Sequence, residues 1–303
     1  MLNKVTTILE YSRILSLPVT FVCWMVIFTY SALVAGHIWY GILGLICVSA
    51  IHLAINILSN YFDYKNLTQK DEFDREEYLR IKDNKHRYLV SGFVKSGDLL
   101  WMAFAHIFVA LAIGVFFYLK CGKVVLNIAL IGFILSLLTI FSSKIRYSEL
   151  LPSLSYGPLL FCGTYLVMTK TFNTDAILLS IPYLFLSATV LYVRSIKNYD
   201  NDLSENHITI ANSFDSQLDS LVILKWLIVA TYVSPILLCL FDILDWQILA
   251  VWGTIPAAMN LYKSMKECTS EKEANCEPEI YQARKIAIFY SLISVVAIIL
   301  ALN

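Results

Sequence analysis

The stretch INILSNYFDYKNLTQKDEFDREE, residues 55–77, carries the end of a long apolar run into a strongly charged segment. Asn56, Asn60 and Asp63 within it are spaced i, i+4 and i+7. On a helix these three positions return to the same side, within about 60° of one another. Amide and carboxylate groups are costly near hydrocarbon, so their presence at the end of an apolar run predicts a functional site.

A second stretch, RSIKNYDNDLSENHIT at residues 194–209, has the same arrangement at the end of another apolar run. Asn198, Asp202 and Glu205 are again spaced i, i+4 and i+7, and Arg194 falls on the same face. The alternative interpretation is that each cluster only caps helices beside a loop. Because two matched clusters occur in one chain, we interpret them as two halves of one site.

The composition predicts a membrane protein. Hydrophobic residues make up 58% of the 303 residues, and the mean hydropathy is +0.67. A typical soluble domain is only about 45–50% apolar. The formal net charge is zero and the basic residues are scattered among acidic ones, so we expect no nucleic-acid partner.

Nine apolar stretches of near bilayer length follow one another along the chain. They lie at about 14–36, 38–60, 99–119, 124–142, 150–169, 177–197, 220–241, 246–262 and 286–302. The first is too long for the apolar part of a signal peptide. The fifth carries Pro152, Gly157 and Pro158, which predicts a kinked helix. The sequence therefore predicts an all-α, polytopic membrane protein. We expect a single domain, residues 1–303, with active-site loops at about 61–98 and 198–219.

The basic residues predict the orientation of these spans. If the N-terminus is cytoplasmic, the inner segments hold 19 of the 23 Lys and Arg residues. The positive-inside rule then places the N-terminus and both polar clusters on the cytoplasmic side, and the C-terminus on the other. We expect a multi-pass protein of a bacterial-type inner or plasma membrane.

The oxygen-bearing side chains of the two stretches predict a Mg²⁺ site. Magnesium is commonly held by one or two carboxylates together with the phosphate oxygens of a substrate. Two clusters that face each other would therefore suit a divalent metal and a diphosphate. The candidate metal ligands are Asn60, Asp63, Asp71, Asp74, Asn198, Asp202 and Glu205.

Basic residues on the same side of the membrane would complete a diphosphate pocket. Arg87 lies in HRYLVSG, residues 86–92, and Lys144 and Arg146 lie between the fourth and fifth spans. Arginine binds phosphate oxygens in a bidentate manner, and lysine supplies a point charge. Taken singly, a residue of this kind more often anchors a helix end among lipid headgroups; the arrival of all three on the side of both acidic clusters favours the diphosphate pocket.

The seven cysteines include no CxxC pair, and five of them lie in or beside apolar stretches, where we interpret them as small hydrophobes. Cys268 and Cys276 share one polar loop. We expect no zinc site there, because the loop has no histidine partner for the two cysteines.

These motifs resemble those of the UbiA superfamily of intramembrane prenyltransferases, nine-helix membrane proteins with aspartate-rich motifs after helices two and six. NILSNYFDYK at residues 56–65 is similar to the family's N-xxx-D-Y-x-D-Y-K, and RYLVSG at 87–92 to R-P-L-x-S-G. KNYDND at 197–202, followed by a threonine seven residues later, is similar to R-D-xxx-D…T. YGPLLFCGTY at 156–165 is similar to the fifth helix of the 1,4-dihydroxy-2-naphthoate polyprenyltransferase branch.

The resemblance implies Mg²⁺-dependent transfer of a prenyl group from a prenyl diphosphate to an aromatic acceptor. The reaction would occur in a central cavity that nine transmembrane helices surround and that opens to a cytoplasmic-side cap. The acceptor would be dihydroxynaphthoate-like, as in menaquinone biosynthesis, or another quinone or aromatic precursor, and the isoprenoid tail would lie among the helices beside membrane lipid. On this pattern the catalytic residues are Asp63, Arg87, Lys144 and Asp202. The substrate-binding residues are Asn56, Asn60, Arg146, Tyr147, Arg194, Lys197 and Asn198.

The chain departs from the family pattern at four motif positions. The first aspartate of each motif is an asparagine here, Asn60 and Asn198; the usual arginine before the second is Lys197, and the proline after Arg87 is Tyr88. An asparagine keeps an oxygen ligand but removes a charge, which weakens Mg²⁺ binding without abolishing it. A non-catalytic or specialised isoprenoid-binding relative is therefore an alternative.

Two other classes of membrane protein fit the pattern less well. A secondary transporter would have its paired acids near the middle of the membrane, whereas these clusters lie at the ends of apolar runs. A CDP-alcohol phosphotransferase would carry D-G-x-x-A-R followed by G-xxx-D-xxx-D, which this sequence lacks.

Overall fold

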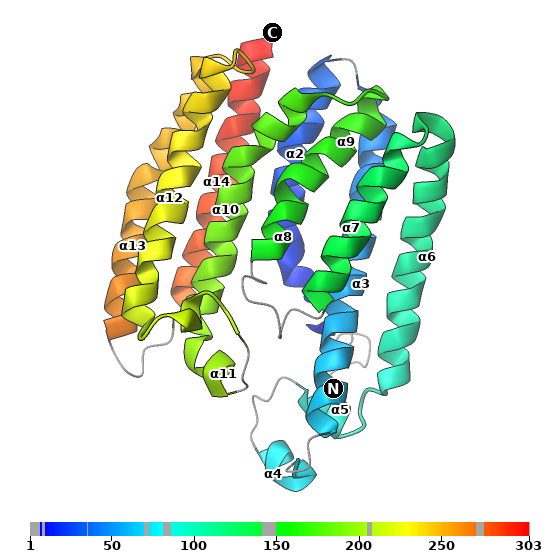
Figure 1. The fold of residues 1–303 in the computed structure, drawn as a ribbon, viewed down its shortest axis with the longest axis vertical. Coiled ribbons are helices and arrows are strands. Elements are labelled where there is room, and N and C mark those ends of the chain that lie inside the picture. The colour runs from blue at the N-terminus through cyan, green and yellow to red at the C-terminus, as the bar shows by residue number, and fades with distance from the viewer. Residues whose placement is uncertain are drawn as a thin grey trace. The chain divides into compact units, whose positions relative to one another are not determined.

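The computed structural model describes residues 7, 10–34, 36–69, 73–80, 86–140, 150–204, 208–270 and 276–302. Every regular element within these ranges is a helix, which agrees with the predicted all-α class (Figure 1). The chain divides into two compact units. One comprises Met1–Leu17 with Ile46–Phe116, and the other comprises Pro18–Leu45 with Phe117–Asn303.

The first unit is built around the part of the long helix α3 that follows Leu45. Its regular elements are the turn η1 (Ile14–Ser16), α3 (Ile38–Thr68), α4 (Arg75–Arg80), α5 (Arg87–Val90) and most of α6 (Ser96–Cys121). A buried cluster joins α3, α5 and α6 to the chain before η1. Its members are Tyr11, Ile57, Leu89, Val94, Leu99 and Ala103. This cluster fixes the position of α5 beside the charged end of α3.

The second unit contains the other helices and is centred on α10. Its elements are α2 (Leu17–Val34, from Pro18), α7 (Val124–Ile140), α8 (Leu151–Leu154), the π-helical turn η4 (Ser155–Leu159), α9 (Leu160–Thr169), α10 (Thr174–Lys197), α11 (Tyr199–Ser204), η5 (Ala211–Ser213), α12 (Gln217–Leu240), the 3₁₀-helix η6 (Trp246–Thr254), α13 (Ile255–Ser270) and α14 (Glu277–Leu302). Helices α10, α12, α13 and α14 lie side by side (Figure 1). The α10 helix packs against α12, α14, α9 and η4, and it carries two fully buried tyrosines, Tyr183 and Tyr192.

The predicted kink in the fifth apolar stretch is present at Gly157. This residue has φ −89° and ψ −106°, which is not helical, and it divides the stretch into α8, η4 and α9. Pro158 contributes because proline cannot donate the backbone hydrogen bond of a continuous helix. The missing side chain of Gly157 also matters: a Cβ there would lie 3.0 Å from Cβ of Leu184 on α10. The break therefore allows close packing on α10.

Among the described residues, six helices are long and apolar enough to cross a membrane: α2, α3, α6, α10, α12 and α14. They coincide with the first, second, third, sixth, seventh and ninth stretches predicted from the sequence. The remaining three stretches are helical but shorter or interrupted. The fourth is the 17-residue α7, the fifth is broken at Gly157, and the eighth is divided between η6 and α13. Pro256 lies in the first turn of α13, where its missing N–H is tolerated.

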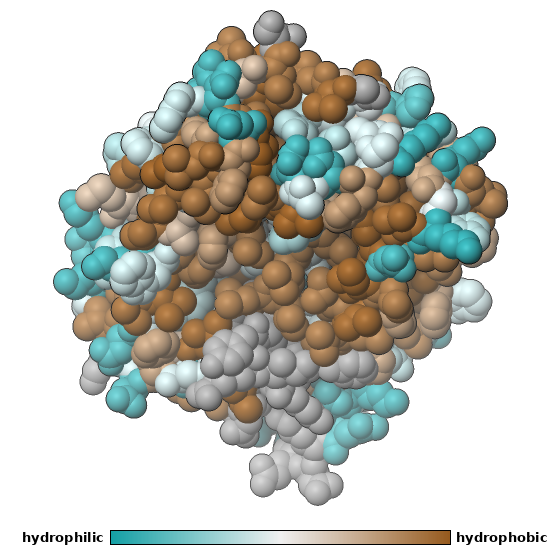
Figure 2. All heavy atoms as spheres, turned by 45° about the horizontal axis from the view of Figure 1, so that its top comes forward, coloured by the Kyte–Doolittle hydropathy of each residue, from teal (hydrophilic) through white to brown (hydrophobic). Residues whose placement is uncertain are grey.

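Apolar side chains cover much of the face turned to the viewer in Figure 2. Large apolar side chains are also exposed on α6, where Trp101, Phe108 and Leu119 are each more than 70% exposed. Exposed apolar area on this scale marks a surface that contacts lipid or another protein rather than water. This agrees with the high mean hydropathy of the chain.

Candidate active site

Asn56 and Asn60 attach the N-terminal segment to α3. Asn60, only 2% exposed, donates from Nδ2 to the carbonyl oxygens of Tyr11, at 2.7 Å, and of Asn56, at 3.0 Å. Asn56 donates from Nδ2 to the carbonyl oxygen of Ser12, at 3.1 Å, and more weakly to Oγ of Ser16, at 3.4 Å. An ionised aspartate can only accept hydrogen bonds. The asparagine at position 60 therefore has a structural reason, because this position needs a donor.

Asp63 lies one helical turn beyond Asn60 on α3 and is half-buried. The spacing places its carboxylate on the same face as the Asn60 amide. Asp74 has a different role: its Oδ1 accepts hydrogen bonds from the backbone N–H groups of Glu76, at 2.8 Å, and Glu77, at 3.3 Å. Asp74 thus caps α4 from an exposed position, as the alternative interpretation of these acids expected.

Arg87 is the first residue of α5 and is half-buried. The preceding His86 is buried, with its ring parallel to that of Tyr11 at a centroid distance of 6.4 Å and edge-on to that of Tyr64 at the same distance. Burial raises the pKa of Tyr11 to about 12, so this phenol is neutral at physiological pH. The ring contacts hold α5, and hence Arg87, beside α3. Tyr11 and His86 were not among the site residues predicted from the sequence; the only signal was the position of His86 next to the motif arginine.

The second motif begins at a break between α10 and α11. Asn198 caps the C-terminal end of α10, with φ −86° and ψ 6°, and its N–H donates to the Arg194 carbonyl at 3.1 Å. The N–H of Asp202 donates to the Asn198 carbonyl at 2.8 Å, so the two motif residues remain one turn apart across the break. Tyr199 donates its hydroxyl to the Phe214 carbonyl at 2.7 Å, which fixes α11 against the following loop. Asp202 and Arg194 are both half-buried.

Lys197, which precedes this break, forms an ion pair with Glu277 at the start of α14. The lysine side chain is 28% exposed and the glutamate side chain 58% exposed. Glu277 lies 80 residues further along the chain, so no local sequence pattern identifies it as a partner. The charge that we assigned to substrate binding is thus shared with a carboxylate of the same unit.

The predicted site residues are divided between the two units. The first unit contains Asn56, Asn60, Asp63, Asp74 and Arg87, and the second contains Arg194, Lys197, Asn198 and Asp202. Five predicted site residues lie outside the described residues: Asp71, Lys144, Arg146, Tyr147 and Glu205. Each unit therefore contains carboxylate and amide side chains together with a basic one among its predicted site residues. Carboxylate and amide oxygens are the ligand types that suit a hard divalent cation, and basic side chains suit a phosphate group.

The sequence matches the model of the UbiA prenyltransferase family over residues 16–293. No protein of curated function matches it. A digeranylgeranylglyceryl phosphate synthase structure is similar over 99% of this chain and 98% of its own, with 16% identity and a TM-score of 0.62. A UbiA homologue from Archaeoglobus fulgidus bound to GPP and Mg²⁺ is similar over 95% of this chain and 99% of its own, with 15% identity and a TM-score of 0.59. A UbiA homologue from Aeropyrum pernix K1 is similar over 92% of this chain and 97% of its own, with 13% identity and a TM-score of 0.59.

The fold and the motif residues define an integral membrane protein of the prenyltransferase class. The chain belongs to the UbiA prenyltransferase family. The resemblance noted from the motifs is therefore confirmed at the level of the family.

Proposed function

We propose that the protein transfers a prenyl group from a prenyl diphosphate to an aromatic acceptor in a Mg²⁺-dependent reaction. The observation that carries this proposal is the preservation of one carboxylate in each motif, Asp63 and Asp202, both half-buried near the end of a long apolar helix. A solved homologue bound to GPP and Mg²⁺, and another bound to DMAPP and Mg²⁺, support the donor class and the metal.

The two motifs are proposed to face one cavity among nine transmembrane helices. The positive-inside distribution supports a cytoplasmic N-terminus and a cavity that opens on the cytoplasmic side. Oxygens of Asn60, Asp63, Asn198 and Asp202 would hold Mg²⁺, which when bound neutralises diphosphate charge as the leaving group departs. Asp71 and Glu205 are proposed as further ligands. Asp74 is the weakest member of the proposed set, because its Oδ1 already caps α4.

The basic residues and the apolar walls have separate tasks in this reaction. Arg87 and Arg194, with Lys144, Arg146 and Lys197, would bind the diphosphate and stabilise it as it leaves with the electron pair of the broken C–O bond. Asn56 would position the helix face, and Tyr147 would contact the substrate. The acceptor carbon then forms the new C–C bond and its ring loses a proton. Apolar walls exclude water, which would otherwise capture the allylic cation.

For the acceptor we propose a dihydroxynaphthoate-like ring, as in menaquinone biosynthesis. The support is the similarity of residues 156–165 to the fifth helix of that branch. In the fold this stretch is the broken segment packed on α10, which includes the non-helical Gly157. The isoprenoid tail would lie between the helices and the surrounding lipid.

The test is a product assay on membranes that contain the protein. Labelled prenyl diphosphates of several lengths are incubated with a panel of aromatic acceptors, with Mg²⁺ or with a chelator, and the lipids are analysed by mass spectrometry. We expect a prenylated aromatic product that requires Mg²⁺. Binding of the diphosphate without any product from the panel would instead support the non-catalytic, isoprenoid-binding relative.

A further inference from the structure

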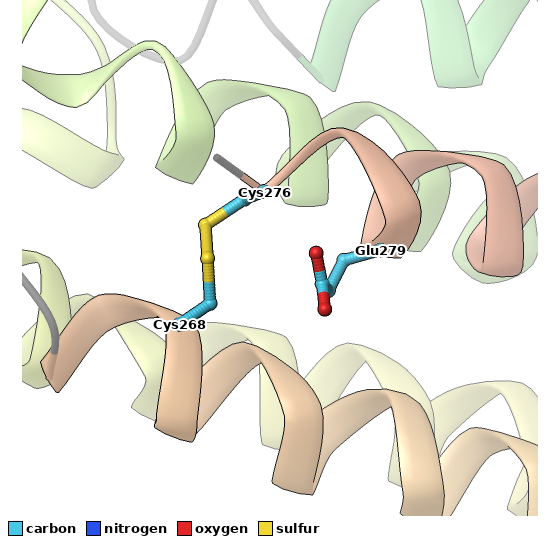
Figure 3. A group of neighbouring side chains, drawn as sticks. All are labelled: Cys268, Cys276 and Glu279. Carbon is cyan, nitrogen blue, oxygen red and sulfur yellow. A yellow bond between two sulfur atoms is a disulfide. The ribbon is translucent and has the colours of Figure 1, made fainter. Parts of the chain in front are cut away.

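The polar ends of α13 and α14 carry a group of side chains that the transferase reaction does not use. Cys268 lies near the end of α13, Cys276 directly precedes α14, and their sulfur atoms form a disulfide with Cα atoms 6.1 Å apart. Glu279 lies in the first turn of α14, and its carboxylate stands beside the disulfide between the two helices (Figure 3). The sulfur and carboxylate atoms of the three residues all lie within 4.8 Å of one another.

The Glu279 carboxylate is buried without a complete set of partners. The residue is 8% exposed. Its Oε1 accepts a hydrogen bond from Oγ of Ser264 on α13, whereas its Oε2 has no hydrogen-bond partner in the described part of the chain. Burying a carboxylate is costly unless it is paired or coordinates a metal ion. A cation beside Oε2 would satisfy it, and the nearest soft ligands are the two sulfur atoms.

We propose that Cys268, Cys276 and Glu279 form a site for one thiophilic divalent ion of the Zn²⁺ type when the cysteines are reduced. Two thiolates and a carboxylate are an accepted ligand set for zinc, and a water molecule would take the fourth position beside the half-buried Cys268. With Zn–S bonds of about 2.3 Å and tetrahedral angles, the two sulfur atoms need to stand about 3.8 Å apart. In the reduced protein, rotation about the two Cα–Cβ bonds would have to supply this separation between Cα atoms that stand 6.1 Å apart in the disulfide.

The oxidation state of the cysteines controls the site. A dithiol reductant delivers two electrons and two protons to the disulfide, which becomes two thiols, while the reductant itself becomes a disulfide. Metal binding then displaces both thiol protons, because the thiolate is the ligand form. The oxidised pair has no thiolate to offer. Ser264 orients the carboxylate through its hydrogen bond to Oε1, as outer-shell groups commonly do at metal sites.

The sequence contained part of this signal. The spacing of Cys276 and Glu279 places both within one turn at the start of α14, and we discounted a zinc site only because histidines are missing. The carboxylate replaces the missing histidine in the folded chain. This proposal is independent of the proposed prenyl transfer, because its test measures metal binding and not turnover.

The test is an anaerobic titration of the full-length protein, purified in detergent, with Cd²⁺ as the probe. One sample is reduced with a phosphine and freed of reductant, and a second is left oxidised. Thiolate-to-cadmium charge-transfer absorption reports sulfur ligands only, so Cd²⁺ on carboxylate sites is silent. We expect a band that saturates at one equivalent in the reduced sample and no band in the oxidised one. Equal absorption in the two samples, or none in the reduced one, overturns the proposal without any mutation.

Variants assign the ligands. Cys268→Ser and Cys276→Ser should each abolish the saturable band. Glu279→Gln, which keeps the shape of the side chain, should weaken binding by about tenfold or more. The matched controls are Cys239→Ser, a free cysteine, and Glu267→Gln, an exposed acid beside Cys268; both should bind as the unmodified chain does. Unchanged affinity in Glu279→Gln would remove the glutamate from the site.

Discussion

Lys197 and Glu277 form an ion pair between the last residue of α10 and the first residue of α14. The lysine immediately precedes the second motif, at the position where the family pattern has an arginine. Its charge is therefore divided between a carboxylate of the same chain and the diphosphate that we propose as substrate. Because both side chains are partly exposed, the pair is weak and can exchange partners.

Removing the competing carboxylate should strengthen donor binding. In Glu277→Gln the lysine is freed for the diphosphate, so we expect KM for the prenyl diphosphate to fall by about two- to fivefold, with kcat little changed, as suits a pair of this strength. Steady-state kinetics in membranes or detergent measure both KM for the prenyl diphosphate and kcat. Glu267→Gln is the control, since this acid is exposed and lies on α13. A raised KM in Glu277→Gln would mean that the pair positions the lysine instead of competing for it.

The two motif carboxylates should be indispensable to the reaction. Asp63→Asn and Asp202→Asn keep side-chain shape but remove a charged metal ligand, so we expect each to lower the Mg²⁺-dependent release of diphosphate by about 100-fold or more. Asp200→Asn is the matched control, because Asp200 is exposed on the same short helix as Asp202. Wild-type rates in both motif variants would rule out the metal assignment.

Restoring the family's aspartate at position 60 should destabilise this chain. In Asn60→Asp the buried group can no longer donate to the carbonyls of Tyr11 and Asn56 and would face them with a negative charge. We expect a loss of about 1–3 kcal/mol and a Tm lower by several degrees, measured in detergent. The deficit should shrink at low pH, where the introduced carboxyl is protonated and donates again. Asn66→Asp, at an exposed position of α3, should leave Tm almost unchanged.

The break in the fifth stretch should not tolerate a side chain. A Cβ at Gly157 would meet Cβ, Cα and N of Leu184 at 3.0, 3.1 and 3.2 Å, and the last two are backbone atoms that cannot rotate away. Gly157→Ala is expected to cost about 1–3 kcal/mol, again visible as a lower Tm. The control is Gly163→Ala on α9, whose Cβ would meet only a side-chain methyl of Ile128 at an ordinary 3.6 Å. Equal stability of the two variants would contradict the close approach.

Tyr11 should make the protein sensitive to alkali. Its pKa is raised from 10.0 to about 12 by burial, so the folded state holds this proton more firmly than the unfolded state. The corresponding stability is complete below pH 10 and is lost as the pH rises from about 10 to 12. In Tyr11→Phe this part of the alkaline loss should disappear. Chemical denaturation at pH 8 and pH 11 measures the free energy of unfolding of the wild-type protein and of Tyr11→Phe. An equal decrease in the two proteins between these pH values would exclude Tyr11 as the cause.

Hydrophobic patterning was sufficient to place the long helices and to put Asp63 and Asp202 near helix ends. It was less accurate at boundaries. The ninth stretch begins at Glu277 and not near residue 286, because its first turns are charged yet still helical. The sixth begins at Thr174, where Asn173 accepts a hydrogen bond from the N–H of Asp175, a capping pattern that the sequence already contained.

Contacts between distant residues were not predictable in this way. Asn60 and Tyr11 are 49 residues apart, and Lys197 and Glu277 are 80 apart. Such pairs depend on how the helices pack against one another. The hydrophobic periodicity and the composition of the sequence do not determine that packing. The cap formed by Asp74 is local, but a loop acid beside a candidate metal motif has the same sequence signature as a ligand. Burial and hydrogen-bond partners separate the two roles.

The hydrogen bonds from Asn56 and Asn60 to residues 11–16 have a consequence for any shortened form of the protein. A version that starts after Ser16 would keep the six long apolar helices of the described residues. It would remove both acceptors of the Asn56 amide, and it would leave the Asn60 amide only the carbonyl of Asn56. Water or detergent headgroups would then enter beside the Asp63 carboxylate on the same helix face. Removal of residues 1–16, by a protease or by design, would thus disturb the first motif from a distance of more than forty residues while leaving the long apolar helices in place.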